Sequence, residues 1–205
     1  MLNSLKNFPC KLVIPAILIT MVMLASCKKD KTSATTSGIE GTYKFKSFSA
    51  QTQSSIAGNL GDKIVTLSDY TTTNNGGTLT FANNTVTVTG LTYSVNTQAE
   101  FYEYYNNSLL DSASYPFNFT LPASNSTAQY QLVGTDSIYF PNGGITTISD
   151  GSGTYQGKAG GGRYSINGNV LTIIQHPVKD SSFTDSGESY LLHESATGSM
   201  ELEKQ

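Results

Sequence analysis

Two histidines are the first residues of this chain whose type and spacing could support chemistry. His193 is followed by Glu194, as in the zinc-binding string of metalloproteases, but the second histidine of that string would stand at position 197, which is Thr. The other histidine, His176, precedes Pro177 and could share a metal with His193 only if the fold brought both beside a carboxylate. We therefore expect two separate histidines at strand ends and no metal site.

A glycine-rich segment, Gly151–Lys158, invites comparison with the loops that bind phosphate. Such a loop needs glycine at position 152 and Ser or Thr after the lysine, whereas this chain has Ser152 and Ala159. The chain has no Gly-x-Ser-x-Gly motif, and its acidic residues are scattered without a pairing that would assign a general acid and a general base. The sequence therefore predicts a loop here, no catalytic residues and no cofactor, and it favours a protein that is not an enzyme.

Aromatic residues that alternate with polar ones are the candidates for lining a ligand site or filling a core. They are Tyr43, Phe81, Tyr93, Phe101, Tyr105 and Tyr164. In the densest aromatic segment, alternation would place Phe101 and Tyr105 on one face of a strand and Tyr102 and Tyr104 on the other. We expect one pair to pack in the core. The other pair is either part of the wall of the fold or an exposed platform for a sugar ring or a protein partner.

The elements that would position these residues are strands, because apolar residues recur with period two from Gly41 onward. Leu79 and Phe81 alternate with Thr78 and Thr80. Asn83-Asn84 supplies a turn, and residues 85–89 continue the alternation of threonine with valine. At Gly90 the apolar phase slips by one residue. A slip at a glycine predicts a β-bulge that keeps both halves of the strand on the same face.

Further short strands follow along the chain, and no segment has the period of a helix. We expect them at Phe101–Tyr105, Phe117–Leu121, Tyr130–Val133, Ser137–Phe140, Asn169–Gln175, Tyr190–Glu194 and Ser199–Glu203. Pro116 and Pro122 bracket one of them, which predicts an edge strand or a strand end. Asn167-Gly168 is the strongest hairpin signal. About ten short strands indicate an all-β fold, an antiparallel up-and-down barrel with a β-sandwich as the alternative.

The amino-terminal residues have the pattern of an export signal. Lys6 and Lys11 precede an apolar run, Leu12–Leu24, which is shorter than the roughly 20 apolar residues of a membrane-spanning helix. The run ends in Leu24-Ala25-Ser26-Cys27, which resembles the lipobox of bacterial lipoproteins. The resemblance implies that residues 1–26 are removed as a signal peptide. It also implies that Cys27 carries acyl chains, which anchor the protein to a membrane without a spanning helix.

The residues after Cys27 indicate which membrane holds the anchor. Lys28-Lys29-Asp30-Lys31 is similar to the start of many Bacteroidota lipoproteins, and Lys28 stands where an Asp would retain some lipoproteins at the inner membrane. We therefore expect anchoring to the outer membrane of the cell envelope, on its periplasmic face or at the cell surface. Residues 27–38 are rich in Ser and Thr and have the composition of a flexible tether to a domain of residues 39–205.

Three short stretches of that domain resemble bacterial lipocalin-like lipoproteins. Gly41-Thr42-Tyr43 is similar to the Gly-x-Trp start of lipocalins, with Tyr in place of Trp, and Tyr164–Ile173 fits the hairpin pattern Tyr-x-Ile-x-Gly-Asn-x-Leu-Thr-Ile. The alternating ending Met200–Lys204 is also similar. The resemblance implies a closed antiparallel barrel, often with an interior cavity for a small molecule.

Asp111-Ser112-Ala113 resembles the acceptor of Bacteroidota O-glycosylation, which makes Ser112 a candidate for carrying a glycan.

Charge and cysteine content exclude several classes of function. Charged residues make up 13% of the chain and the formal net charge is −3. The lysines beside Cys27 belong to the tether, so the domain has few cations with which to neutralise a run of phosphates, and we expect no nucleic-acid binding. Cys10 lies in the segment that is removed, which leaves Cys27 without a partner for a disulfide or a cysteine metal site.

The sequence therefore favours a membrane-anchored, non-enzymatic binding module for a small apolar or amphiphilic ligand or a glycan fragment. The alternative is a cell-envelope lipoprotein with a filled barrel that has a structural role or binds another protein. Interior volume separates the two functions. Large side chains such as Tyr43, Phe81, Tyr93 and Tyr164 filling the barrel would favour the alternative, and an open cavity would favour the small ligand.

Overall fold

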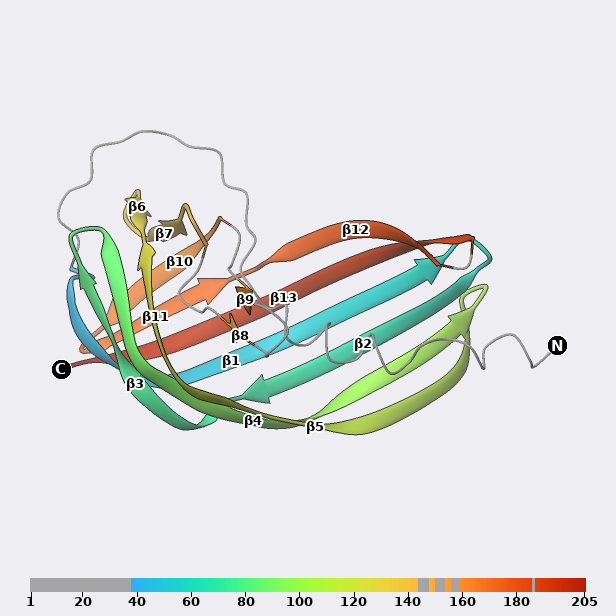
Figure 1. The fold of residues 1–205 in the computed structure, drawn as a ribbon, viewed down its shortest axis with the longest axis horizontal. Helices are drawn as coiled ribbons and strands as arrows, with labels where there is room; N and C mark the ends of the chain where they lie inside the picture. Colours follow the sequence, from blue (N-terminus) through green and yellow to red (C-terminus); the bar gives the residue numbers. More distant parts are fainter. Residues whose placement is uncertain (1–37, 144–147, 150–153, 156–158, 186) are drawn as a thin grey trace.

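The computed structural model describes residues 38–143, 148–149, 154–155, 159–185 and 187–205. Regular structure in these residues consists of strands, which pair antiparallel, and this confirms the prediction of an all-β, antiparallel fold (Figure 1). None of the described residues forms a helix with the length and apolar character of a membrane span. The signal peptide, Cys27, the tether before residue 38 and most of Gly151–Lys158 lie outside the described residues.

Most of the described strands belong to one large sheet. The strands are β1 (Gly41–Gly58), β2 (Asp62–Thr71), β3 (Thr73–Ala82), β4 (Thr85–Tyr105), β5 (Ser108–Gln129), β6 (Gln131–Val133), β7 (Ser137–Phe140), β8 (Ile148–Ser149), β9 (Thr154–Tyr155), β10 (Gly160–Asn167), β11 (Val170–Gln175), β12 (Val178–Asp185) and β13 (Glu188–Lys204). Strands β8 and β9 pair with each other, and the remaining eleven form the large sheet.

Four long strands, β1, β4, β5 and β13, run through two regions of this sheet, which we call the body and the extension (Figure 1). In the body they pair with β3 and β11, and β10, β7 and β6 continue the order from β11. In the extension the order is β12–β13–β1–β2–β4–β5, because β2 and β12 replace β3 and β11 as neighbours. Strands β5 and β6 are separated by Tyr130 alone, whose amide donates a hydrogen bond to the carbonyl of Asn84.

The hydrophobic core lies in the body. Its buried members come from the strands of that region and from Ile39, which precedes β1. They are Ile39, Tyr43, Phe45, Leu79, Phe81, Val86, Val88, Leu91, Leu121, Tyr130, Ile138, Phe140, Tyr164, Leu171, Ile173, Met200 and Leu202. We call the sheet face that carries these side chains the inner face and the opposite one the outer face.

Two irregularities let the inner face continue from the body into the extension. The pairing of β1 with β13 shifts between Phe45 and Ser47, so that Phe48 returns to the face of Phe45. The pairing of β4 shifts between Val88 and Leu91, around Gly90 with its φ of 64°. The second shift is the bulge that the apolar phase predicts, and the prediction is confirmed.

The strands are longer than expected. The segments predicted as Tyr190–Glu194 and Ser199–Glu203 are parts of β13, and β5 runs through both Pro116 and Pro122. In the described chain β5 pairs with β4 and with no strand on its other side, so it is an edge strand as the prolines indicate. It does not end at them, since a proline that lacks an N–H is tolerated where the ladder has an open side.

Candidate functional site

Aromatic side chains pack against one another in the interior of the body. The rings of Tyr43 and Phe81 meet edge to face with centroids 5.7 Å apart, and Phe81 meets Tyr130 at 5.5 Å. Tyr43 and Phe81 are 1% exposed and Tyr164 is 9% exposed. Tyr93 packs against this cluster from the side, with its ring 6.0 Å from that of Phe45. Four of the predicted lining residues therefore belong to the packed core or touch it.

Burial also determines the ionisation of the core tyrosines. The Tyr43 hydroxyl has no hydrogen-bond partner among the described groups, and desolvation raises its pKa. Burial likewise raises the pKa of Tyr130 and of Tyr93. These hydroxyls stay protonated at neutral pH, because a buried phenolate would lose its hydration.

Phe101 and Tyr105 lie in the extension, away from the core. The predicted alternation holds, since Phe101 is opposite Thr66 on the inner face and Tyr102 is opposite Val65 on the outer face. The expectation that one of the two aromatic pairs packs in the core is wrong, because β4 has left the body before it reaches this segment. Phe101 instead meets the ring of Tyr115 edge to face at 5.4 Å, and Tyr105 is 49% exposed.

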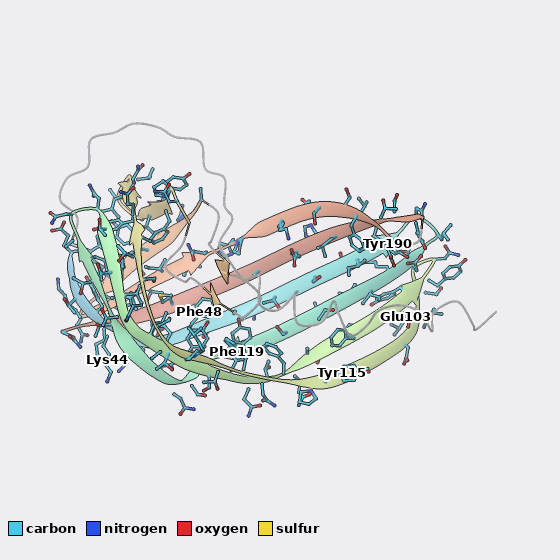
Figure 2. All side chains as sticks on the ribbon, in the orientation of Figure 1. Lys44, Phe48, Glu103, Tyr115, Phe119 and Tyr190 are labelled. Atoms are coloured by element: carbon cyan, nitrogen blue, oxygen red, sulfur yellow. The ribbon has the colours of Figure 1, made fainter. Side chains whose placement is uncertain are left out.

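The inner face of the extension combines apolar side chains with carboxylates. Leu192, Ile56 and Ile64 stand opposite one another on neighbouring strands, and at the far end Phe183 stacks on Tyr190 with centroids 5.2 Å apart. By register, the acidic side chains on the inner face of the extension are Asp62, Glu103, Asp111, Asp185, Glu188 and Glu194. Figure 2 shows Glu103 and Tyr190 toward the far end, and Phe48 and Phe119 where the body meets the extension.

The acids at the far end act on Tyr190. Its pKa is raised to about 12, first by burial, next by the hydrogen bond from its hydroxyl to Glu188 Oε2 at 2.8 Å, and then by the charges of Glu188, Asp62 and Asp185. All three carboxylates disfavour a phenolate. The far end of the inner face is therefore an electronegative surface around a pair of stacked rings.

The outer face of the extension is hollowed by a polar trough. Its volume is about 1060 Å³, and it crosses the strands near the body. The lining residues are Gln51, Thr52, Gln53, Leu67, Ser68, Asp69, Asn96, Thr97, Gln98, Glu100, His176, Val178, Ser195, Ala196 and Thr197. This lining carries two carboxylates, several amides and hydroxyls, and neither Lys nor Arg.

Hydrogen bonds position some of these polar groups and leave others available. Gln51 Nε2 donates to Asp69 Oδ2 at 3.2 Å, and the hydroxyl of Tyr102 donates to Glu100 Oε2 at 2.8 Å. Ser114 Oγ donates to Gln98 Oε1 at 3.3 Å, so the Gln98 amide nitrogen keeps both of its protons for other acceptors. The trough therefore offers oriented donors and acceptors to a polar ligand.

The structure does not bring the remaining predicted residues together. His193 Nδ1 lies 2.7 Å from Asp180 Oδ1, and His176 Nδ1 lies 3.1 Å from Thr197 Oγ1, so the two histidines have different partners. Within the described ranges, no group of three or more His, Cys, Asp or Glu could hold a metal ion. Ser112 is exposed on edge strand β5, and its amide donates to Asp111 Oδ1 at 2.8 Å.

The trough is not predicted by the sequence patterns described above. The segment around Gln51 and Gln53 alternates glutamine with small residues, a period-two pattern without apolar residues, and hydrophobic periodicity does not detect it. Asp69 and Gln98 enter the site by register with Gln51 across β1, β2 and β4.

Comparison of the chain with models of protein families, with curated proteins and with solved structures gave no match.

Proposed function

We propose that this chain is the precursor of a lipid-anchored envelope protein that binds a partner protein through its extension and performs no chemistry. The lipobox Leu24–Cys27 supports removal of residues 1–26 and acylation of Cys27, and Lys28 favours the outer membrane. The described chain enters the body at Ile39, and β1 runs from there to the far end of the extension (Figure 1). An anchor at Cys27 would therefore hold the body near the membrane and let the extension project from it.

The anchored body is, in this proposal, a lipocalin-like up-and-down barrel. Pairing runs from β1 through β3 and β4 to β5, and from β6 through β7, β10, β11 and β13 back to β1. Because Tyr130 alone separates β5 from β6, the two series of pairings support a closed ring of strands. The Tyr164–Ile173 hairpin, which carries the lipocalin-like pattern, lies in β10 and β11 of this ring.

The packed aromatic cluster in the interior is the observation that carries the choice of function. A small apolar ligand or glycan fragment inside the barrel needs space that the rings of Tyr43, Phe81 and Tyr130 occupy. Binding on the outside of the molecule needs no such space. The inner face of the extension carries exposed aromatic side chains at Tyr115 and Phe183.

The chemistry of the inner face defines the partner. Its exposed rings, Tyr115 and Phe183, lie on the two outer strands of the order β12–β13–β1–β2–β4–β5, whereas Ser54, Ile56, Thr66 and Ser68 on its central strands are buried. By register, its acids outnumber its cations: Lys179 is the one cation in the described part of this face, and it lies 3.0 Å from Glu194. The surface therefore suits a protein with an apolar patch ringed by Lys and Arg.

Site-specific photo-crosslinking in the native envelope tests this interaction. A photoreactive phenylalanine analogue replaces Phe183 on the inner face, Val178 on the outer face of the same strand, or Val133 in the body; these side chains are 41%, 49% and 38% exposed. We expect one discrete protein adduct from position 183 alone, and we expect it to weaken in high salt and in an Asp185→Asn, Glu188→Gln variant. Identical adducts from all three positions, or none from position 183, would contradict the proposal.

The anchor is tested separately. Labelled palmitate should enter the wild-type protein and not a Cys27→Ser variant, because the thiol is the acceptor of the diacylglyceryl group. The variant should also leave the membrane fraction, since its apolar attachment is lost. Absence of label in the wild-type protein would remove the anchor from the proposal and leave the binding surface standing.

A further inference from the structure

We propose that the trough on the outer face of the extension is a binding site for a neutral oligosaccharide. This site lies on the face opposite the protein-binding surface, and it does not depend on the function proposed above. Its position follows from register, since Thr197, Gln51, Asp69 and Gln98 project from adjacent strands on the outer face. A ligand in it would lie across the strands.

The polar groups of the trough match hydroxyl groups better than any other common ligand chemistry. Ionised Asp69 and Glu100 accept hydrogen bonds and cannot donate them, so they require donors. The free protons of the Gln98 amide require an acceptor. A sugar hydroxyl supplies both, and an O–H donor on a carboxylate makes one of the stronger hydrogen bonds available to a neutral ligand.

The acceptors of the trough are held in place before a ligand arrives. Gln51 orients the Asp69 carboxylate through one oxygen and leaves the other oxygen for a ligand. Tyr102 holds Glu100 in the same way, and Thr97 Oγ1 donates to the Asp69 carbonyl at 2.7 Å. Fixing these groups in the free protein reduces the entropy lost on binding.

The apolar part of the lining fits the same class of ligand. Leu67 and Val178 lie among the polar residues of the trough and offer contact to the C–H face of a sugar ring. The charge of the lining excludes anionic ligands, because two carboxylates without Lys or Arg repel phosphate, sulfate and uronate groups. An uncharged chain of sugars meets these conditions, because it supplies hydroxyl donors and acceptors together with C–H faces and carries no anionic group.

Saturation-transfer NMR on the full chain in detergent tests the site. The probes are neutral tetrasaccharides of glucose, mannose, galactose or N-acetylglucosamine, an oligogalacturonate as the anionic counterpart, and a neutral tetrapeptide as competitor. We expect transfer to at least one neutral tetrasaccharide, none to the oligogalacturonate, and no displacement by the peptide. The interaction should be weak, because an open trough leaves much of a ligand in water.

Variants locate the binding in the trough. Asp69→Asn should weaken binding about tenfold, because it removes a charged acceptor, and Gln98→Ala about threefold. The matched controls are Asp111→Asn on the inner face and Gln131→Ala in β6, both exposed, and they should bind as the wild type does. Unchanged binding in the double variant Asp69→Asn, Gln98→Ala, transfer to none of the neutral tetrasaccharides, equal binding of the oligogalacturonate, or full displacement by the peptide would each overturn the proposal.

Discussion

The body and the extension share the strands β1, β4, β5 and β13, yet their inner faces carry different side chains. Along β1 the inner face changes from Tyr43 and Phe45 in the body to Ala50 and Ser54 in the extension. The first pair belongs to the core cluster, and the second pair does not. A strand can therefore keep its pairing while its inner face changes from large core side chains to small buried ones. In the body, packing of large apolar side chains adds to the hydrogen bonds of the ladder, whereas the buried inner-face residues of the extension include Ser54, Thr66 and Ser68, which bury less apolar area.

The largest expected difference between the regions is the effect of removing one aromatic ring. Phe81→Ala should lower the free energy of unfolding by about 3–5 kcal/mol, because it opens a cavity between Tyr43 and Tyr130. Phe183→Ala, at a stacked and 41% exposed ring of the extension, should cost less than about 1 kcal/mol. Urea denaturation measures both. Equal losses would mean that the extension is packed as tightly as the body.

A smaller effect is expected at the bulge that joins the inner faces of the two regions. Gly77 has a φ of 100°, and a Cβ there would lie 2.7 Å from the backbone of Gly90, so Gly77→Ala should cost at least about 2 kcal/mol. At Gly90, with a φ of 64°, a Cβ would meet nothing within 4 Å, and Gly90→Ala should cost about 1–2 kcal/mol from backbone strain alone. A larger loss in Gly90→Ala would show that the close approach of the two backbones is not what requires glycine at 77.

Local patterns in the sequence predict local features of this fold. The turn at Asn83-Asn84 is confirmed, with φ values of 51° and 58°, and the bulge at Gly90 follows from a phase slip that is visible in a few residues. The extension could not be predicted in this way. Its inner face carries Ser54, Thr66 and Ser68, so apolar periodicity ends although the strands continue.

The candidate sites depend on pairing between distant segments. Asp69 meets Gln51 because β1 and β2 pair in a particular register, and Phe183 meets Tyr190 through the register of β12 and β13. Neither register can be predicted from the sequence of one segment alone. Alternation predicts that the aromatic residues of β4 lie in a strand. It does not predict whether they lie in the body or in the extension, because the same alternation occurs in both.

Alkaline titration separates the two regions by the cause of their raised tyrosine pKa values. Since the folded pKa lies above the unfolded value of about 10, these tyrosines stabilise the fold below pH 10, and that stability is lost as the pH rises above 10. For Tyr43 the cause is burial, whereas for Tyr190 the carboxylate of Glu188 adds to burial. Glu188→Gln should therefore lower the pKa of Tyr190 and leave that of Tyr43 unchanged, measured by tyrosinate absorbance in single Tyr→Phe backgrounds. A parallel shift of both pKa values would show that the two regions are coupled.

The smallest expected effect concerns an exposed ion pair of the body. Lys46 Nζ lies 2.9 Å from Glu203 Oε2, and this hydrogen bond, with the Lys46 charge, lowers the pKa of Glu203. A lowered folded pKa stabilises the fold above the unfolded pKa of about 4.3, and the contribution is lost as the pH falls through the folded value. Because Lys46 and Glu203 are 46% and 39% exposed, solvent screens the pair, and Lys46→Gln should raise the pKa of Glu203 with little change in unfolding. Carboxyl NMR titration measures the shift. A large loss of stability in Lys46→Gln would mean that the end of the β1–β13 ladder depends on this pair, and that packing does not hold the body as firmly as its buried rings indicate.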